Sequence, residues 1–336
     1  MRLSVLDLSP IPSGASAAEA LRNTVDLARH AEAIGLHRVW LAEHHNAAAL
    51  ASSSPEVLIA AVAAATSRIR VGSGGIMLPN HSPLKVAETF RVLAALYGDR
   101  IDLGVGRAAG TDAKTALALR RSRDLLGAEA FPAQLGELMT FLTYDPDPAT
   151  RFGPIKAVPA GVAPPPIFLL GASVESASLA AELGVGFAFA HHIAPEHHVA
   201  AMLAYREAFR PSRWSPAPHA ILATSVLCAA DDAAAEDLSR AADLSWLRFG
   251  QGLRDLPLPS VAEARAYCFD ADEEALRRPR RHVAGGPARV KDELAAMLAD
   301  TAADELMVTS AIHDHEERKR SYSRVAELLG VTPRDA

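Results

Sequence analysis

Cysteine, long apolar runs and excess positive charge are all scarce in this chain. Cys228 and Cys268 are its two cysteines. They are too few for a disulfide framework and form no CxxC pair, so we expect a reducing, cytoplasmic setting. No apolar run is long enough to cross a bilayer, and the first residues show no cleavable signal pattern. The formal net charge of -6 gives no electrostatic reason to bind nucleic acid or an anionic membrane.

What the chain does contain is a regular alternation of short apolar runs and helical periodicity. The predicted strands cover residues 3–8, 38–42, 69–74, 101–105, 167–170, 186–190, 220–227 and 305–309, and the last predicted helix covers 322–329. Strands that are apolar without alternation indicate a parallel sheet covered on both faces. A doubly wound open sheet would fit this alternation. Eight such units in one continuous chain favour a closed α/β (β/α)8 TIM barrel, a single domain over residues 1–336.

Two insertions interrupt this rhythm, one after strand four and one after strand seven. Residues 144–166 are rich in proline, which removes backbone donors, so we expect a loop or hairpin there. Residues 250–286 have little apolar periodicity and carry Arg277, Arg278, Arg280 and Arg281. The second segment suits a mobile lid over the barrel mouth or a solvated linker.

Glu43, His44 and His45 follow the buried strand 38–42 directly. Parallel barrels keep their chemistry at the carboxyl ends of the strands, and histidine titrates near neutral pH. The alternative is a structural polar turn. Strand alternation places Glu43 and His45 on one side and His44 on the other, so both histidines cannot face the same ligand.

Glycine-rich sequence marks the ends of strands three and four. Gly74 and Gly75 allow a flat ligand to approach the backbone closely. The run 104–110 has the spacing GxGxxxG, which departs from the GxGxxG dinucleotide motif. What remains is Gly106 followed by Arg107, a guanidinium that suits a phosphate or carboxylate, or else a surface salt bridge.

Strand five opens a helix through Gly171, Ala172 and Ser173. Free N–H groups of the first turn, with the hydroxyls of Ser173 and Ser176, form a potential anion site. A plain serine N-cap explains the same residues without a ligand. Near the C-terminus, His313, Asp314, His315, Glu316 and Glu317 look like metal ligands. We predict instead that they cap the last helix, and we predict no metal site.

Together these motifs resemble those of the bacterial luciferase-like flavin monooxygenases, most closely the single-subunit branch, over nearly the whole chain. The resemblance rests on residues 39–45, 71–79 with 82–83, 104–107, 171–173, 304–308 and 318–322. It implies a (β/α)8 barrel that binds reduced FMN (FMNH2) supplied by a separate flavin reductase. It also implies a cis peptide bond at Gly74-Gly75 and a homodimer.

The resemblance further assigns roles by position. The flavin ring would lie against Gly74-Gly75, with Glu43 nearby, and the two glycines would leave extra room beside it. Gly106 would also be a cofactor-binding residue. The FMN phosphate would meet a set of residues on strands four and five: Arg107, Ala172, Ser173, Val174 and Ser176. The catalytic group would be His44 as acid/base, oriented by Glu43 and His45. Light-emitting members carry a reactive cysteine where Gly106 stands, so their substrate behaviour is not expected here.

The expected function is therefore an FMNH2-dependent monooxygenase that uses O2 through a C4a-peroxyflavin on an unidentified small organic substrate. Such chemistry needs a dry pocket and one positioned proton donor or acceptor. Two alternatives remain open: an F420-dependent hydride-transfer oxidoreductase, and a non-catalytic flavin-binding protein on the same barrel.

Overall fold

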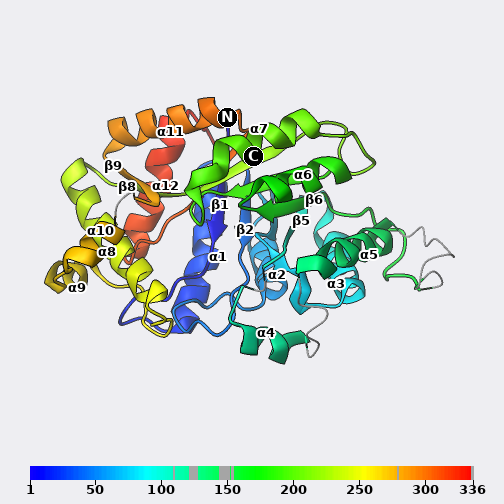
Figure 1. Cartoon of the computed structure of the whole chain (residues 1–336), viewed down its shortest axis with the longest axis horizontal. Helices are drawn as coiled ribbons and strands as arrows, with labels where there is room; N and C mark the ends of the chain where they lie inside the picture. The colour runs from blue at the N-terminus through cyan, green and yellow to red at the C-terminus, as the bar shows by residue number, and fades with distance from the viewer. Residues whose placement is uncertain (109, 121–127, 144–151, 153–154, 278–279, 334–336) are drawn as a thin grey trace.

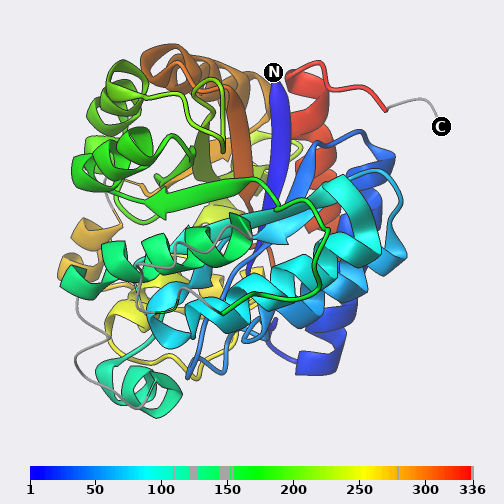
Figure 2. The same cartoon turned by 90° about the vertical axis from the view of Figure 1, so that its right-hand side faces the viewer.

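Eight parallel strands close into a barrel that is surrounded by helices (Figures 1 and 2). The computed structural model describes residues 1–336 except 109, 121–127, 144–151, 153–154, 278–279 and 334–336. The hydrogen-bonded order is β10-β1-β2-β3-β5-β6-β7-β8, and β10 pairs with β8 to complete the ring. The predicted (β/α)8 TIM barrel is confirmed, because all eight predicted strands are present.

The barrel strands are β1 (Arg2–Asp7), β2 (Arg38–Leu41), β3 (Arg70–Ser73), β5 (Ile101–Gly106), β6 (Ile167–Gly171), β7 (Gly186–Ala190), β8 (Ala220–Cys228) and β10 (Glu305–Thr309). Two short strands add to them: β4 (Ile76–Met77) pairs with β5, and β9 (His282–Gly285) pairs with the end of β8. The helices are α1 (Ala17–Ala33), α2 (Pro55–Ala65), α3 (Pro83–Tyr97), α4 (Ala113–Arg120), α5 (Phe131–Thr143), α6 (Val174–Leu183), α7 (His198–Ala208), α8 (Asp232–Gly250), α9 (Val261–Ala266), α10 (Ala271–Leu276), α11 (Pro287–Thr301) and α12 (His315–Leu328). In the described part of the chain, none of these helices has the length and apolar character needed to cross a membrane.

Strand alternation divides the core into two layers. One layer lies between the strands and the helices, and it includes Val39 and Leu41 of β2. The other layer fills the barrel interior with Leu6, Trp40, Ala42, Phe168, Ala188, Ile221, Ala223 and Met307. The rings of Trp40 and Phe168 meet edge to face at 5.1 Å. The interior is therefore closed by packed side chains, and ligands have access only from an end.

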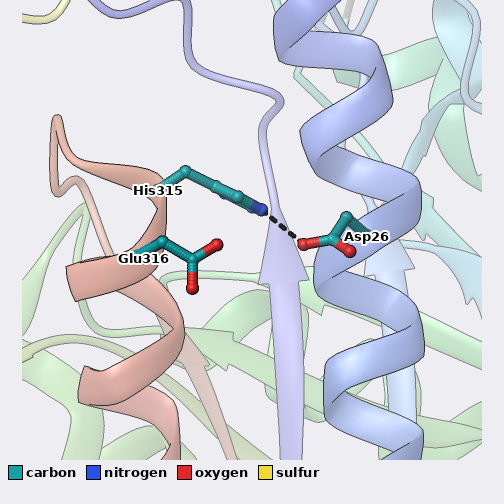
Figure 3. A group of neighbouring side chains, drawn as sticks. All are labelled: Asp26, His315 and Glu316. Atoms are coloured by element: carbon teal, nitrogen blue, oxygen red, sulfur yellow. Dashed lines mark hydrogen bonds and ion pairs between the residues drawn. The ribbon is translucent and has the colours of Figure 1, made fainter.

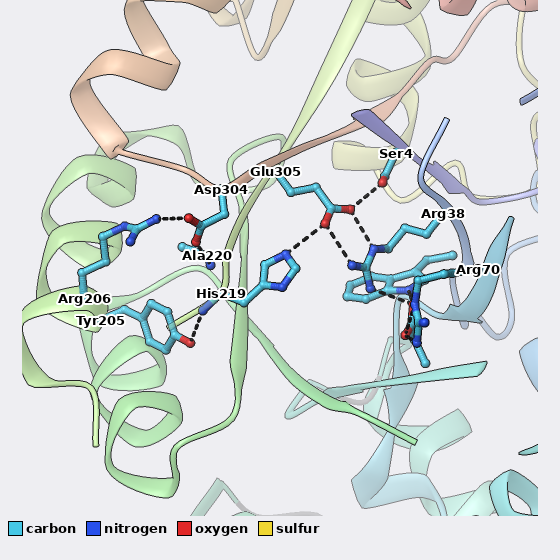
Figure 4. A network of polar contacts seen from close by, with 11 residues as sticks. Ser4, Arg38, Arg70, Tyr205, Arg206, His219, Ala220, Asp304 and Glu305 are labelled. Carbon is cyan, nitrogen blue, oxygen red and sulfur yellow. Dashed lines mark hydrogen bonds and ion pairs between the residues drawn. The ribbon is translucent and has the colours of Figure 1, made fainter. Parts of the chain in front are cut away.

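The amino ends of the strands are closed by a buried network of charges (Figure 4). Arg38 donates to Asp102 at 2.7 Å and, through two nitrogens, to Glu305 at 2.7 and 3.0 Å. Burial by itself would raise the pKa of Glu305, but Arg38 and His219 hold it at about 2. The network joins β2, β5 and β10 around the barrel, at the end where barrel residues serve stability.

The last helix begins seven residues earlier than predicted, at His315 rather than Tyr322. Asp314 caps it by accepting from the Glu317 N–H, and Glu316 and Glu317 lie in its first turn. The predicted capping role of this acidic run is confirmed. The predicted start was wrong because the polar first turns of α12 carry little apolar periodicity.

The two insertions differ in how much of them is described. In the proline-rich stretch 144–166, residues 144–151 and 153–154 lie outside the described part. The described residues of 250–286 include α9, α10 and β9, and both α9 and β9 pack against α8. Arg277 pairs there with Asp243 at 2.9 Å. The segment is thus built from regular elements, and its motion as a lid stays a prediction.

Replacement of Glu305 by Gln should lower the free energy of unfolding by about 3 kcal/mol or more, because Arg38 then keeps a buried charge that is only partly compensated. Urea unfolding at pH 7 measures this loss. The carboxylate has a pKa of about 2 in place of the usual 4.5. Its stabilisation is therefore complete above about pH 4.5 and is lost as the pH falls towards 2.

Asp304→Asn is the matched control. Its carboxylate pairs with Arg206 at 2.7 Å with a side chain that is 35% exposed, so the expected cost is about 1 kcal/mol or less. Equal decreases in the free energy of unfolding of the two variants would contradict a special role for the buried network.

Candidate active site

The carboxylate of Glu43 organises the carboxyl end of β2. It is fully buried and accepts from four groups on different parts of the chain. The donors are His45 Nε2 (2.8 Å), His81 Nε2 (2.8 Å), Asn80 Nδ2 (3.2 Å) and the Met77 N–H (2.8 Å). The predicted placement of Glu43 and His45 on one side is confirmed by their hydrogen bond.

Glu43 is an anion at neutral pH. Burial raises its pKa, but the hydrogen bonds from His45 and His81 outweigh burial and bring the pKa to about 2. Glu43 in turn raises the pKa of His81 above its ordinary value, against the opposing effect of burial. Oε1 accepts from His45, Asn80 and His81, and Oε2 accepts from the Met77 N–H, so this geometry suits Glu43 to orienting its neighbours.

His44 lies on the other side of the chain from Glu43. Trp40 and Ala42 face the barrel interior, and the same two-residue alternation, carried past the end of β2, places His44 on that side as well. Its Nδ1 is buried and has no hydrogen-bond partner among the described residues. Burial and the nearby His192 lower the pKa of His44 to about 4, although Glu43 opposes them. His44 is therefore neutral at pH 7. A histidine with a pKa near 7 was expected at this position, and the expectation was wrong because burial lowers the pKa.

His192 belongs to the same end of the barrel. It follows β7, and its Nδ1 lies 3.1 Å from the carbonyl oxygen of Ala223, an interior residue of β8. Burial also lowers the pKa of His192. The barrel mouth thus presents two neutral imidazoles over an apolar interior.

A cis peptide bond joins Gly74 and Gly75 between β3 and β4, as the resemblance implies. We call these two residues the glycine ledge. A Cβ on Gly74 would lie 2.6 Å from Leu6 Cδ1, and one on Gly75 would lie 2.8 Å from the Gly104 carbonyl oxygen. The expected extra room is not present on these sides, because neighbouring atoms already fill it.

Arg107 and the start of α6 follow adjacent strands, β5 and β6. Ser173 and Ser176 form a capping box, which confirms the serine N-cap. Arg107 is exposed and forms no ion pair within the described ranges. The pKa of the Glu175 carboxyl is lowered by hydrogen bonds from its own backbone N–H and from Ser173, and the charge of Arg107 also lowers it. A free guanidinium beside a helix N-terminus suits an anionic group such as a phosphate.

The structure brings together residues from four predicted motifs. They lie at or just after the carboxyl ends of β2, β3, β5 and β6, which are neighbours in the barrel: Glu43, His44, His45, Gly74, Gly75, Gly106, Arg107, Ala172, Ser173, Val174 and Ser176. Sequence reasoning missed Asn80 and His81, which bind Glu43, and Met77. The signal was present, since the run of polar residues 80–82 directly follows the glycine motif.

One group outside the mouth has the composition of a metal site. Asp26, His315 and Glu316 lie together between α1 and α12 (Figure 3). His315 Nε2 is 2.9 Å from Asp26. The ammonium of Lys319 bonds both Asp26 at 2.8 Å and Glu316 at 2.7 Å, so a side-chain cation already neutralises the carboxylates.

Comparison with known proteins agrees with this geometry. Residues 1–318 match the family described as luciferase-like monooxygenase. A luciferase-like monooxygenase of Escherichia coli (strain K12) is 40% identical, over 97% of this chain and 98% of that protein. The N-acetyl-S-alkylcysteine monooxygenase of Bacillus subtilis (strain 168) is 36% identical, over 98% of each. The crystal structure of apo-MsnO8 has a TM-score of 0.91 and 42% identity, over 99% of each chain.

More distant structures show the fold alone. The FMN-bound oxygenating constituent of 3,6-diketocamphane monooxygenase from Pseudomonas putida is 19% identical, over 100% of this chain and 99% of that one, with a TM-score of 0.69. An F420-dependent secondary alcohol dehydrogenase is 13% identical, over 99% of each chain, with a TM-score of 0.66. The fold therefore accommodates either cofactor.

Replacement of Glu43 by Gln should lower the pKa of His81, because the histidine then loses the anion that stabilises its charged form. The amide oxygen still accepts from Met77, so the variant is expected to fold. Titration of the histidine ring signals by NMR measures the change. Asp112→Asn is the control, since Asp112 bonds Asn46 rather than a histidine. A His81 that titrates alike in all three proteins would contradict this role for Glu43.

Proposed function

The chain belongs to the luciferase-like monooxygenase family and is a monooxygenase by that membership; from this premise we propose that its cofactor is FMNH2 and that His44 is the catalytic residue. Reduced FMN would supply two electrons, so that one atom of O2 enters the substrate and the other leaves as water. The first substrate class to test is an organic thioether, because one relative is named for S-alkylcysteine oxidation.

One observation carries the proposal. A neutral imidazole whose buried Nδ1 has no partner among the described residues stands at the barrel mouth. Gly74 and Gly75 follow the neighbouring strand β3, and Arg107, exposed and without an ion pair in the described part of the chain, follows β5. The ledge suits a planar ring, and Arg107 with the first turn of α6 suits a phosphate. Ala172, Ser173, Val174 and Ser176 would line that phosphate position, and Gly106 would border the ring.

The chain's own groups divide the work. Glu43 stays ionised and holds His45, His81 and the backbone after the ledge in place. His44 starts neutral, so at pH 7 it accepts a proton before it donates one. The apolar interior below His44 limits the access of water. This favours transfer of an oxygen atom to the substrate over release of hydrogen peroxide.

The choice between FMNH2 and reduced F420 is a direct binding question. Anaerobic titration with each cofactor, followed by admission of O2, separates them because a deazaflavin does not activate oxygen in this way. We expect tight binding of FMNH2 and flavin reoxidation coupled to product. Preferential binding of F420 would overturn the FMN assignment. Binding of FMNH2 without product would favour a flavin-binding protein.

Three further features of the proposal rest on the family resemblance. They are a cytoplasmic location, a homodimeric state and supply of FMNH2 by a separate reductase. The free thiols of Cys228 and Cys268 suit a reducing compartment.

Replacement of His44 by Gln should lower product formation by about a hundredfold or more, because the proton acceptor is lost. FMNH2 affinity should stay within about threefold, since the substitution removes no cofactor contact. The assay measures oxidation of N-acetyl-S-methylcysteine against hydrogen peroxide released. His30→Gln is the control, a half-buried histidine on α1 that bonds Ser323. A His44→Gln enzyme with the activity of the control would sink the assigned role.

Replacement of Arg107 by Met should weaken FMN binding by about tenfold or more, the value of a charged hydrogen bond. Riboflavin, which lacks the phosphate, should bind both proteins equally. Fluorescence titration with the two flavins gives both constants. Arg213→Met, an exposed arginine before β8, serves as the control. Equal losses for FMN and riboflavin would show that Arg107 does not bind the phosphate.

A further inference from the structure

Met77 lies directly beyond the glycine ledge, on β4. The preceding residue, Ile76, is buried in the core layer between barrel and helices. Alternation along the strand therefore turns Met77 the other way, towards the barrel mouth. Its side chain is half-buried, whereas both of its chain neighbours are buried. Met77 is thus the residue of β4 that presents a side chain to the site.

The Met77 thioether fills the space that Gly106 leaves. The two residues are paired across β4 and β5. A Cβ built on Gly106 would lie 2.8 Å from Met77 Sδ and 3.6 Å from its Cε. A Cβ built on Gly110 would lie 3.2 Å from Met77 Cγ. The absent side chain at position 106 therefore opens no cavity, because the methionine occupies that volume from the neighbouring strand.

The backbone of Met77 is held in place while its side chain is adaptable. Its N–H donates to the buried Glu43 carboxylate at 2.8 Å. An unbranched thioether has several rotatable bonds and adapts to the shape of its surroundings. A fixed backbone with a flexible apolar end is suited to forming the wall of a pocket.

We propose that Met77 is a specificity-determining residue, a pocket wall that limits the size of the substrate group admitted beside the flavin ring. The inference rests on the proposed function for the identity of the ring. In this proposal Met77, reaching over Gly106, sets the pocket size that a side chain at position 106 would otherwise set.

The first test needs no cofactor. Gly106→Ala should lower the melting temperature in the wild-type background, because its Cβ displaces the Met77 sulfur. In a Met77→Ala background the same change should cost less than half as much. Additive losses would overturn the packing on which the proposal stands.

The second test asks whether position 77 faces the cofactor pocket. In a Cys268→Ser background, Met77→Cys should react with methyl methanethiosulfonate, and saturating FMN should slow the reaction about tenfold by covering the introduced thiol. Cys268→Ser alone is the control, because Cys228 is buried. An introduced thiol that does not react, or that reacts equally fast with FMN bound, would overturn the proposal. Failure of FMN to bind the wild type would count against the proposed function instead.

The third test measures specificity with alkyl methyl sulfides from methyl to hexyl. Met77→Ala should shift the sulfoxide yield towards long chains by about tenfold, and Met77→Phe towards short ones. Met297→Ala, a methionine on α11, should keep the wild-type profile. Unchanged profiles in both Met77 variants would overturn the specificity role. A wild type that oxidises none of the sulfides would count against the thioether substrate class. The first two tests then decide whether Met77 forms the pocket wall.

Discussion

The buried carboxylate of Glu43 is the interaction on which the rest of the site depends. It is one charge that accepts from β4, from the turn after it and from His45, so β4 and that turn are both fixed to the end of β2. An anion without those donors would be very costly to bury, and the donors without the anion would lose their common acceptor. The backbone of Met77, directly after the glycine ledge, is held by this bonding pattern.

The barrel uses buried charge at both ends for different purposes. At the amino ends of the strands, Arg38 pairs with both Asp102 and Glu305, while Arg70 also pairs with Asp102 and His219 with Glu305. At the carboxyl ends, Glu43 is satisfied by the donors around it, while among the described residues His44 Nδ1 has no hydrogen-bond partner and Arg107 has no ion pair. Paired charges stabilise a fold, whereas unused donors and acceptors at a mouth are available for ligands.

Much of this arrangement is predictable from the sequence, and the exceptions have physical causes. Non-alternating apolar runs predicted every barrel strand, and the two-residue period placed Glu43 apart from His44. His81 was missed because it lies 38 residues from Glu43 in the chain and meets it only across folded strands. The start of α12 was missed because it is determined by the Asp314 cap and not by apolar spacing. The low pKa of His44 results from burial, which a sequence pattern does not measure.

The sequence by itself determined the barrel, its strands and the cluster of polar residues at their carboxyl ends, because periodicity and chain order are local properties. It also determined that Glu43 and His45 share a side, since alternation is local too. Only the tertiary structure decided which groups are already satisfied and which are free. Only the tertiary structure showed that Met77 fills the volume beside Gly106. Both depend on contacts between strands far apart in the chain, and these contacts exist only once the barrel has closed.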